Sequence, residues 1–397
     1  MNIIRHHEKL CTHCNLCLDV CPMYNDIDFI DELCGYLNDK HDDVASEDIF
    51  RCLTCGLCID ACPKNLSLKK LITTARAKWV KLHGVRKEHS IVDPNSDNNL
   101  FQAMASICKP ALFGDRTYSN SDDTRCSGTG SVIYYPGCAC TYINTSIIFA
   151  TIDILDCAGV DYTVMDGVSF CCGAVSAGSG NKSVVEKMAK KNIAEIKKRG
   201  AHTIITSCPG CFRAFHDMYP RMFADIDDLG FEVLHISQYL LRLIKEKIIV
   251  PKTLGHRVFY QDPCHLTRSV GIFKEPREVI SSIPSTQLVN DSPKGSGCCG
   301  FGGSVRAVYP AESIEIAKKR QREAVDMGCD TIVTNCPGCM QNMIEAGMGA
   351  ENTPDVYDLA EYVSLSLGNS LKRDDKKMIE DVNKAYAIVI PMYQKPD

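Results

Sequence analysis

The sequence predicts a multidomain protein, with an α-helical N-terminal domain followed by a duplicated α/β domain with parallel sheets. Two cysteine motifs with the same spacing lie within the first 63 residues. A five-cysteine pattern then occurs twice in the C-terminal half. Its matching positions are offset by 126, 127 and 128 residues (Cys138 to Cys264, Cys171 to Cys298 and Cys208 to Cys336). In each copy a short β-branched run alternates with helical segments, which is typical of parallel sheets.

The composition excludes several classes of protein. The chain has 397 residues, 45% of them hydrophobic, and a formal net charge of −5, which does not suit a nucleic-acid binder. No apolar run reaches the roughly 18–20 residues that span a bilayer, and the first residues lack the apolar core of a signal peptide. We therefore expect a cytoplasmic protein that docks on the inner face of the membrane only through a partner.

The cysteine content is the outlier of the composition, with 24 cysteines in the chain. A disulfide framework suits small secreted proteins, whereas this chain is large and shows no export signal. Most of its cysteines fall into tight clusters, which favours thiolate ligands of metals.

The N-terminal motifs are CTHCNLCLDVCP at residues 11–22 and CLTCGLCIDACP at residues 52–63. Both have the C-x2-C-x2-C-x3-C-P spacing of bacterial two-cluster ferredoxins, in which the fourth cysteine reaches the other cluster. Zinc also binds C-x2-C pairs, but two quartets that each end in Cys-Pro are poor zinc signatures. We expect two cubane 4Fe–4S clusters, one held by Cys11, Cys14, Cys17 and Cys62 and the other by Cys52, Cys55, Cys58 and Cys21.

Helices rather than strands are predicted around these motifs, which indicates a helical ferredoxin variety. The helix after the second motif has Ser67 as its N-cap and Gly84 as its end. We expect Cys34, outside both motifs, to be a packed core thiol.

The repeated pattern combines a single cysteine, a Cys-Cys-Gly stretch and a Cys-Pro-Gly-Cys turn. The strands predicted before Cys208 and Cys336 place these thiols where α/β folds bind ligands. The helix after each turn directs its positive end at the site, which favours an anionic cluster. We expect Gly173 and Gly300 to let the backbone approach the cluster. The two sets are Cys138, Cys171, Cys172, Cys208 and Cys211, and Cys264, Cys298, Cys299, Cys336 and Cys339.

Each copy offers five cysteines, although a cubane takes four protein thiolates. Either one cysteine per copy is a bystander, or the cluster is larger or more open than a cube. The presence of all five in both copies favours the unusual cluster.

The expected domains follow from these patterns and from the linker composition between them. They are a helical ferredoxin-type domain (1–85), a linker (86–130), a first lobe (131–250), a second lobe (251–366) and a C-terminal tail (367–397). Cys108 and Cys126 lie in the linker without a partner at any recognisable spacing.

The cysteine pattern of residues 131–345 resembles the CCG domain of the B subunit of CoB–CoM heterodisulfide reductase from methanogenic archaea. Residues 11–66 resemble the C subunit, and the fusion is similar to the D subunit of the membrane-associated enzyme, whose partner is a b-type cytochrome. The resemblance implies two non-cubane 4Fe–4S clusters, with a substrate disulfide split between them.

Two functions are consistent with this resemblance. The first is reduction of the heterodisulfide CoM-S-S-CoB to two thiols, with electrons passing from the ferredoxin-type clusters to the CCG clusters. The ten CCG cysteines would then be catalytic. The second is a non-catalytic electron-transfer subunit of a flavin-dependent glycolate, lactate or glycerol-3-phosphate dehydrogenase. Relatives of the second kind often have one incomplete CCG motif, whereas both are complete here.

Basic residues near the clusters are candidates to bind an anionic substrate. They are Arg213, Arg268 and Arg306, although each is more commonly an ordinary surface or supporting residue. His265, next to Cys264, is a candidate proton donor. Cys140, Cys157 and Cys329 are expected in the core.

Overall fold

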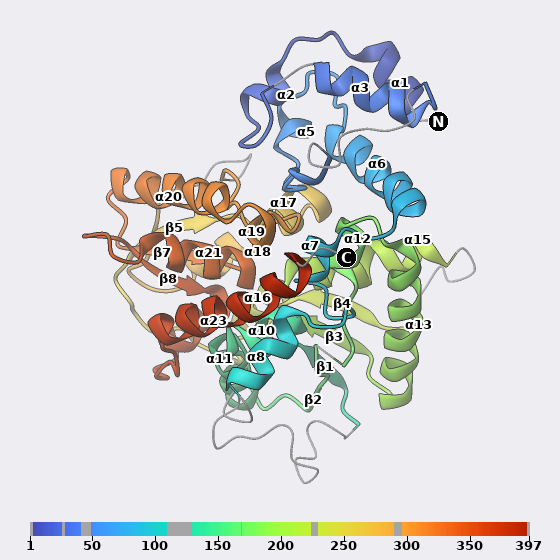
Figure 1. Ribbon diagram of the computed structural model, residues 1–397. Coiled ribbons are helices and arrows are strands. Elements are labelled where there is room, and N and C mark those ends of the chain that lie inside the picture. Colours follow the sequence, from blue (N-terminus) through green and yellow to red (C-terminus); the bar gives the residue numbers. More distant parts are fainter. Residues whose placement is uncertain are drawn as a thin grey trace.

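The computed structural model describes residues 3–25, 28–40, 49–108, 129–167, 169–223, 229–289 and 296–394. A helical N-terminal unit lies on top of two α/β lobes in the view of Figure 1. The helices of this unit are α1 (Ile3–Leu10), α2 (Leu16–Asp19), α3 (Asp28–Leu37), α5 (Leu57–Ala61) and α6 (Leu68–His83).

Helix α6 begins and ends where the sequence predicts. The Ser67 hydroxyl accepts a hydrogen bond from the Lys70 amide at 3.2 Å, and Gly84 ends the helix with φ +83°. The apolar face of α6 packs on α3, and Cys34 is buried in the same core.

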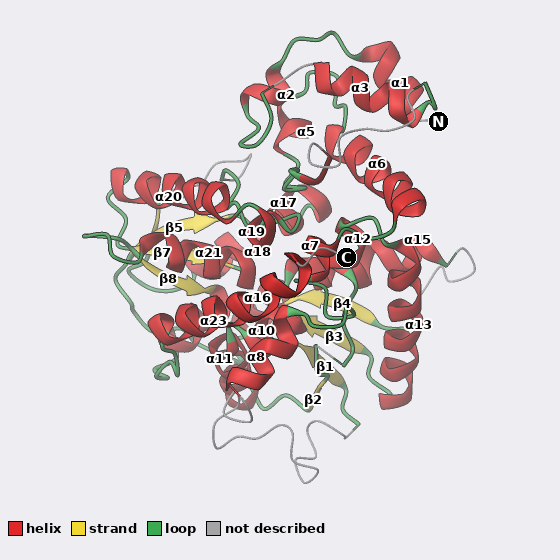
Figure 2. Cartoon of the chain, viewed as in Figure 1, coloured by secondary structure: helices red, strands yellow, loops and turns green. Residues whose placement is uncertain are grey.

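Each lobe contains one four-stranded parallel sheet (Figure 2), which confirms the predicted fold class. The first sheet has the order β2-β1-β3-β4 and the second β6-β5-β7-β8. The strands are β1 (Val132–Tyr135), β2 (Tyr162–Val164), β3 (Thr203–Thr206), β4 (Glu232–His235), β5 (Arg257–Gln261), β6 (Gln287–Leu288), β7 (Thr331–Thr334) and β8 (Asp355–Asp358).

Helices flank both sheets, and the strands beneath them are largely buried, as parallel strands usually are. The first lobe has α10 (Gly137–Tyr142), α11 (Thr145–Cys157), α12 (Ala174–Gly178), α13 (Lys182–Arg199), α14 (Pro209–Arg213), the π-helix η2 (Ala214–Met218), α15 (Tyr219–Met222) and α16 (Ile236–Lys245). The second has α17 (Cys264–Val270), α18 (Lys274–Ser281), α19 (Val305–Val308), α20 (Pro310–Asp326), α21 (Pro337–Gly347) and α22 (Leu359–Ser366).

The two lobes share one hydrophobic core. Helix α11 packs against α22, and α16 packs against α18. A single buried cluster therefore contains Ile147 and Leu240 from the first lobe together with Val279 and Tyr362 from the second. This packing fixes the two repeated cysteine sets relative to each other.

In the described residues outside the lobes there are three further helices, α7 (Lys87–Ser90), α8 (Leu100–Cys108) and α23 (Asp375–Gln394). Helix α23 packs on α8, with Val382, Ala385 and Val389 buried against Phe101 and Met104. Parts of the expected linker and tail thus form a helical layer over the lobes.

Arg76 on α6 joins the N-terminal unit to the first lobe. Its buried guanidinium donates to the carbonyl oxygens of Ile49 and Cys52 at 2.8 Å and to that of Gly178 at 2.9 Å. Hydrogen bonds from a charged donor are the stronger kind, contributing about 1.5–3 kcal/mol each.

A glycine turn joins the N-terminal unit to the second lobe. Gly302 and Gly303 lie directly against the backbone of Cys52 and Leu53, and a Cβ on Gly303 would overlap the Cys52 carbonyl oxygen. The φ of Gly303 is +64°, so glycine is required here both for its conformation and for the close approach.

A side chain on Gly303 should therefore weaken this contact. We expect Gly303→Ala to destabilise the protein by about 2–4 kcal/mol, since a left-handed alanine costs about 1–2 kcal/mol and overpacking about 1–3 kcal/mol. Gly159→Ala is the matched control, because Gly159 has φ +63° but no atom within 4 Å of an added Cβ. Equal unfolding temperatures of the two variants would show that the turn does not hold the junction.

Candidate iron–sulfur sites

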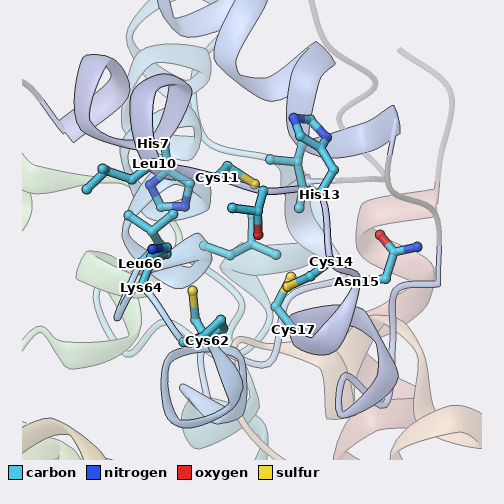
Figure 3. Close-up of a pocket in the computed structure, with 14 residues that line it drawn as sticks. His7, Leu10, Cys11, His13, Cys14, Asn15, Cys17, Cys62, Lys64 and Leu66 are labelled. Carbon is cyan, nitrogen blue, oxygen red and sulfur yellow. The ribbon is translucent and has the colours of Figure 1, made fainter.

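The first site is a cavity in the N-terminal unit that is lined by four cysteines (Figure 3). Three come from the first motif, and Cys62 reaches in from the second. The walls between them are partly apolar, formed by Leu10, Ile30, Leu66 and Leu68. The structure thus brings together the four thiols of the crossed assignment, a donor set that fits a 4Fe–4S cluster.

Both motif loops have the same backbone conformation. His13 and Asn15 flank Cys14 with φ +52° and +64°, and Thr54 and Gly56 flank Cys55 with φ +54° and +81°. Left-handed residues are uncommon outside glycine, so this repeated conformation is a built feature that coils each loop tightly. Sequence reasoning missed it, because only Gly56 signals a positive φ.

The second site joins Cys52, Cys55 and Cys58 to Cys21, whose thiols are near enough to influence one another's ionisation. Burial raises the pKa of Cys52 to about 11 and that of Cys58 to about 12. Thiols with such pKa values ionise only beside strong positive charge, which the iron of a bound cluster supplies.

In each lobe the cysteines lie at the carboxyl ends of the two central strands. Cys138 and Cys208 follow β1 and β3, and Cys264 and Cys336 follow β5 and β7. In the second lobe the Cys339 thiol donates to Cys299 at 3.0 Å between sulfurs. Hydrogen bonds from Cys298 and Cys339 lower the pKa of Cys299 to about 6.

The glycine of each Cys-Cys-Gly stretch has a left-handed conformation and places its amide on a cysteine sulfur, while its expected approach to a cluster stays a prediction. Gly173 and Gly300 have φ +74° and +85°, and their amides donate to Cys171 Sγ and Cys298 Sγ, each at 3.4 Å. A Cβ on Gly300 would overlap the Ser313 carbonyl oxygen. The glycine therefore turns the chain against the next helix while its amide binds the first sulfur of the pair.

The described residues contain no group of three His, Cys, Asp or Glu side chains placed to hold a single metal ion. The fit to iron–sulfur clusters rests on the donor sets themselves: four thiols in each N-terminal site and five in each lobe. Which members of each five-cysteine set bind iron stays a prediction.

The N-terminal unit and the second lobe meet at their cysteines. Cys55 and Cys298 are buried in the same hydrophobic cluster, and Cys298 raises the pKa of Cys55. The second ferredoxin-type site therefore adjoins the second CCG site directly.

Cys140 occupies the region between the lobes. Cys140 is fully buried, and burial raises its pKa. Cys208 of the first lobe and Asp358, Cys336 and Glu361 of the second lobe raise this pKa further. The two CCG sites thus approach the same internal region from opposite lobes.

Three basic residues gather beside Cys264, two of them predicted and one missed. Burial lowers the pKa of Lys69, Arg213 and His265. Arg213 adds to the effect at Lys69, both of these cations add to it at His265, and Arg221 adds to it at Arg213. Lys69 lies on α6 and donates to Ser269 at 2.9 Å. No motif singles it out, because only the docking of the N-terminal unit brings it to the second lobe.

Two of the predicted basic residues have acidic partners. Arg268 bonds Asp60 of the N-terminal unit at 2.8 Å, and Arg306 bonds Glu345 at 2.5 Å beneath the Tyr386 ring. These contacts support structural roles. His265 Nε2 lies 3.4 Å from Thr54 Oγ1, and its lowered pKa disfavours the charged form that a proton donor would need.

Most of the remaining cysteines lie where the sequence predicts, with one exception. Cys140 and Cys329 are buried, but Cys157 is exposed, so its assignment to the core was wrong; it ends α11 on the outer surface. Cys108 lies 3.8 Å from Asp381 Oδ2. Cys126 is outside the described residues.

Family comparisons agree with this architecture. The CCG cysteine-rich domain model matches residues 132–216 and 258–344, and the 4Fe–4S dicluster domain model matches residues 3–63. The chain therefore carries 4Fe–4S clusters of both the ferredoxin and the CCG domain. In the part of the chain that the structure describes, no helix has the length and apolarity to cross a bilayer.

Curated relatives include several oxidoreductases and their subunits. The chain is 34% identical over 63% of its length to the D subunit of dihydromethanophenazine:CoB–CoM heterodisulfide reductase from Methanosarcina acetivorans, and the match covers 62% of that protein. It is 30% identical over 57% of its length to the B subunit of fumarate reductase (CoM/CoB) from Methanothermobacter marburgensis, covering 45% of it. It is 28% identical over 58% of its length to EtfAB:quinone oxidoreductase of Syntrophomonas wolfei, covering 34%. The chain thus spans less than two thirds of each.

The crossed cysteine sets can be separated by substitution. Cys62→Ser should remove the cluster of the first motif, about four of roughly 16 irons per chain, and leave the second. Alkylation followed by mass spectrometry should then label Cys11, Cys14 and Cys17, while Cys52 and Cys58 stay protected. Cys34→Ser, in the core outside both sites, is the control and should keep all the iron. Labelling of Cys52 and Cys58 instead would contradict the crossed assignment.

Proposed function

We propose that this chain, which combines a 4Fe–4S dicluster domain with two CCG domains, belongs to an oxidoreductase that reduces a small anionic disulfide to two thiols. CoM-S-S-CoB, the heterodisulfide in the name of the Methanosarcina relative, is the substrate to try first. The observation that carries the proposal is the contact of Cys55 with Cys298, together with two complete CCG sites.

The ligands that we propose are the cysteines of the two motifs and of the two CCG sets. The clusters, when bound, supply electrons one at a time. The protein sets the order in which they pass, because Cys55 of the second ferredoxin-type site and Cys298 of the second lobe are buried together in one cluster. Since a disulfide takes two electrons, two CCG sites facing a common region suit its cleavage.

Lys69, Arg213 and His265 suit the binding of an anionic substrate group next to Cys264. Arg213 has Asp217 nearby, but Lys69 is influenced by Arg213 and by the thiols of both sites and bonds a neutral serine. The cations Lys69 and Arg213 attract an anion, and His265, whose lowered pKa favours the neutral form, adds a hydrogen-bonding group beside them.

Partners are required in this proposal, because something must reduce the N-terminal clusters. The heterodisulfide reductase and fumarate reductase relatives are both named as single subunits of larger enzymes. We propose an electron-donating partner, with a b-type cytochrome as one such donor, and a position on the inner face of the cytoplasmic membrane through it.

A second candidate is electron transfer without disulfide chemistry, as part of a flavin-dependent dehydrogenase. The similarity to EtfAB:quinone oxidoreductase is the observation in its favour. Under this alternative the chain would accept electrons from a flavoprotein and would leave disulfides unreduced.

The basic group can be tested through Lys69. Lys69→Met should raise the KM for an anionic disulfide about 10-fold or more, since a charged hydrogen bond contributes about 1.5–3 kcal/mol. Lys70→Met is the control, because Lys70 is the exposed neighbour on the same helix. Kinetics with a neutral disulfide should show little change in KM; an equal rise for both substrates would contradict anion binding.

Each Cys-Cys-Gly pair should be indispensable to disulfide reduction. Cys172→Ser and Cys299→Ser should each lower the rate of CoM-S-S-CoB reduction by a reduced viologen dye by at least about 100-fold, because each removes a ligand and leaves one complete site. Cys157→Ser, at an exposed thiol, should keep full activity. Near-normal turnover in either variant would show that the cluster of that lobe only transfers electrons or takes no part in the reaction. Electron acceptance from a flavoprotein without any disulfide reduction would favour the second candidate.

A further inference from the structure

The two lobes end their last strand in the same way but with different chemistry. In the first lobe His235 caps α16, and Gln238 accepts from the His235 amide at 3.0 Å. In the second, Asp358 caps α22 by accepting from the Ala360 amide at 2.9 Å, and Glu361 accepts from the Asp358 amide at 3.0 Å. A neutral pair completes the same capping box, so the cap does not require the two acids.

The two acids lie inside the protein where the lobes meet. Asp358 and Glu361 are both fully buried, and Asp358 Oδ2 has no hydrogen-bond partner among the described residues. An unpaired buried carboxylate oxygen is costly, so a role beyond the cap is needed to explain it.

The groups around Asp358 come from both lobes and include cluster-site thiols. Glu361 and Cys208 raise the pKa of Asp358. Asp358 in turn raises the pKa of three further buried groups. These are Tyr134 on β1, Tyr260 on β5 and Cys140 on α10. Asp358 also pairs in register with Thr334 on the neighbouring strand β7, two residues before Cys336, so it ends its strand beside the second CCG site.

Glu361 connects this region to the outside. Arg373 donates to Glu361 Oε2 at 3.1 Å, and Ser146 lies within hydrogen-bonding reach of the carboxyl group. Arg373 and Ser146 both line a surface cavity at the lobe interface whose rim includes the exposed Lys372 and Asp374. Glu361 Oε2 accepts from Arg373 and from the Asp358 amide, so its carboxyl group lies between the residues that line this cavity and Asp358.

We propose that Asp358 and Glu361 form a proton path from this cavity to the region between the two CCG sites. The inference deepens the proposed function and rests on it. In that reaction the S–S bond breaks, two electrons arrive through the iron–sulfur sites, and each product sulfur takes one proton. Asp358 donates these protons and is reprotonated through Glu361 from water in the cavity.

The environment of the acids suits this role. Burial raises the pKa of Asp358 well above its ordinary value, and Glu361 and Cys208 add to the effect. Burial also raises the pKa of Glu361, although Arg373 acts against it, with Asp375 nearby. Both groups therefore keep their protons to a higher pH than exposed carboxyl groups do.

The test uses Asp358→Asn and Glu361→Gln in the full chain with its clusters. Asparagine caps a helix as well as aspartate does, and glutamine completes the box in the other lobe, so both variants should fold. His235→Asn is the matched control at the repeat-related position, and cluster content and unfolding temperature are measured for all three.

Turnover of the disulfide should fall about 100-fold in Asp358→Asn, as loss of a positioned acid predicts, with a solvent isotope effect larger than that of wild type. The remaining activity should decline steadily as the pH rises, because protons then come from solution. The infrared spectrum of resting wild type should contain the C=O band of a buried protonated carboxyl group, and Asp358→Asn should lack it. His235→Asn should retain both properties.

Unchanged turnover, pH profile and isotope effect in both acid variants would overturn the proton path even where the wild type reduces disulfides. A wild type that reduces no disulfide would overturn the proposed function instead. In that case the infrared band still decides whether the acids hold protons, and its absence overturns the inference independently. If Asp358→Asn fails to fold, Glu361→Gln carries the same comparison.

Discussion

The packing of the N-terminal unit against the second lobe, where Cys55 and Cys298 share one buried cluster, is the constraint on which the order of the cysteine sites depends. It forms only because the Gly302–Gly303 turn brings two backbones together and because Arg76 binds carbonyl groups of both the N-terminal unit and the first lobe. A ferredoxin-type unit that merely shared a chain with the lobes would need no such fit. The close contact places the second ferredoxin-type site next to the second lobe, which is where the proposed electron path enters the CCG sites.

Duplication produced two lobes with the same scaffold but different surroundings. Each retains five cysteines, a left-handed glycine that binds the first sulfur of the pair, and a capping box after its last strand. Among the described residues, the cysteine that shares a buried cluster with the second ferredoxin-type site belongs to the second lobe, and that lobe carries the acids Asp358 and Glu361. The shared scaffold produces two similar cysteine sites, and the differences are the basis of the electron and proton paths that we propose for the second lobe.

The sequence predicted those features that depend on local spacing. Ser67 and Gly84 delimit α6 because capping acts within one turn, and the β-branched runs before Cys208 and Cys336 are strands because their burial is continuous. Contacts between distant segments left no such pattern. Lys69 is an ordinary helix residue until α6 docks beside Ser269, and Arg306 looks free until Glu345 lies against it. Cys157 was misjudged because an apolar helix of 13 residues still has one exposed end.

The most direct test of this account is the magnetic coupling between reduced clusters, measured by electron paramagnetic resonance during stepwise reduction. The signal of the second ferredoxin-type cluster should be split by the cluster of the second lobe, because Cys55 touches Cys298. Cys299→Ser should therefore abolish the splitting, and Cys172→Ser should leave it intact. A splitting that survives Cys299→Ser and disappears in Cys172→Ser would contradict the proposed order of the sites.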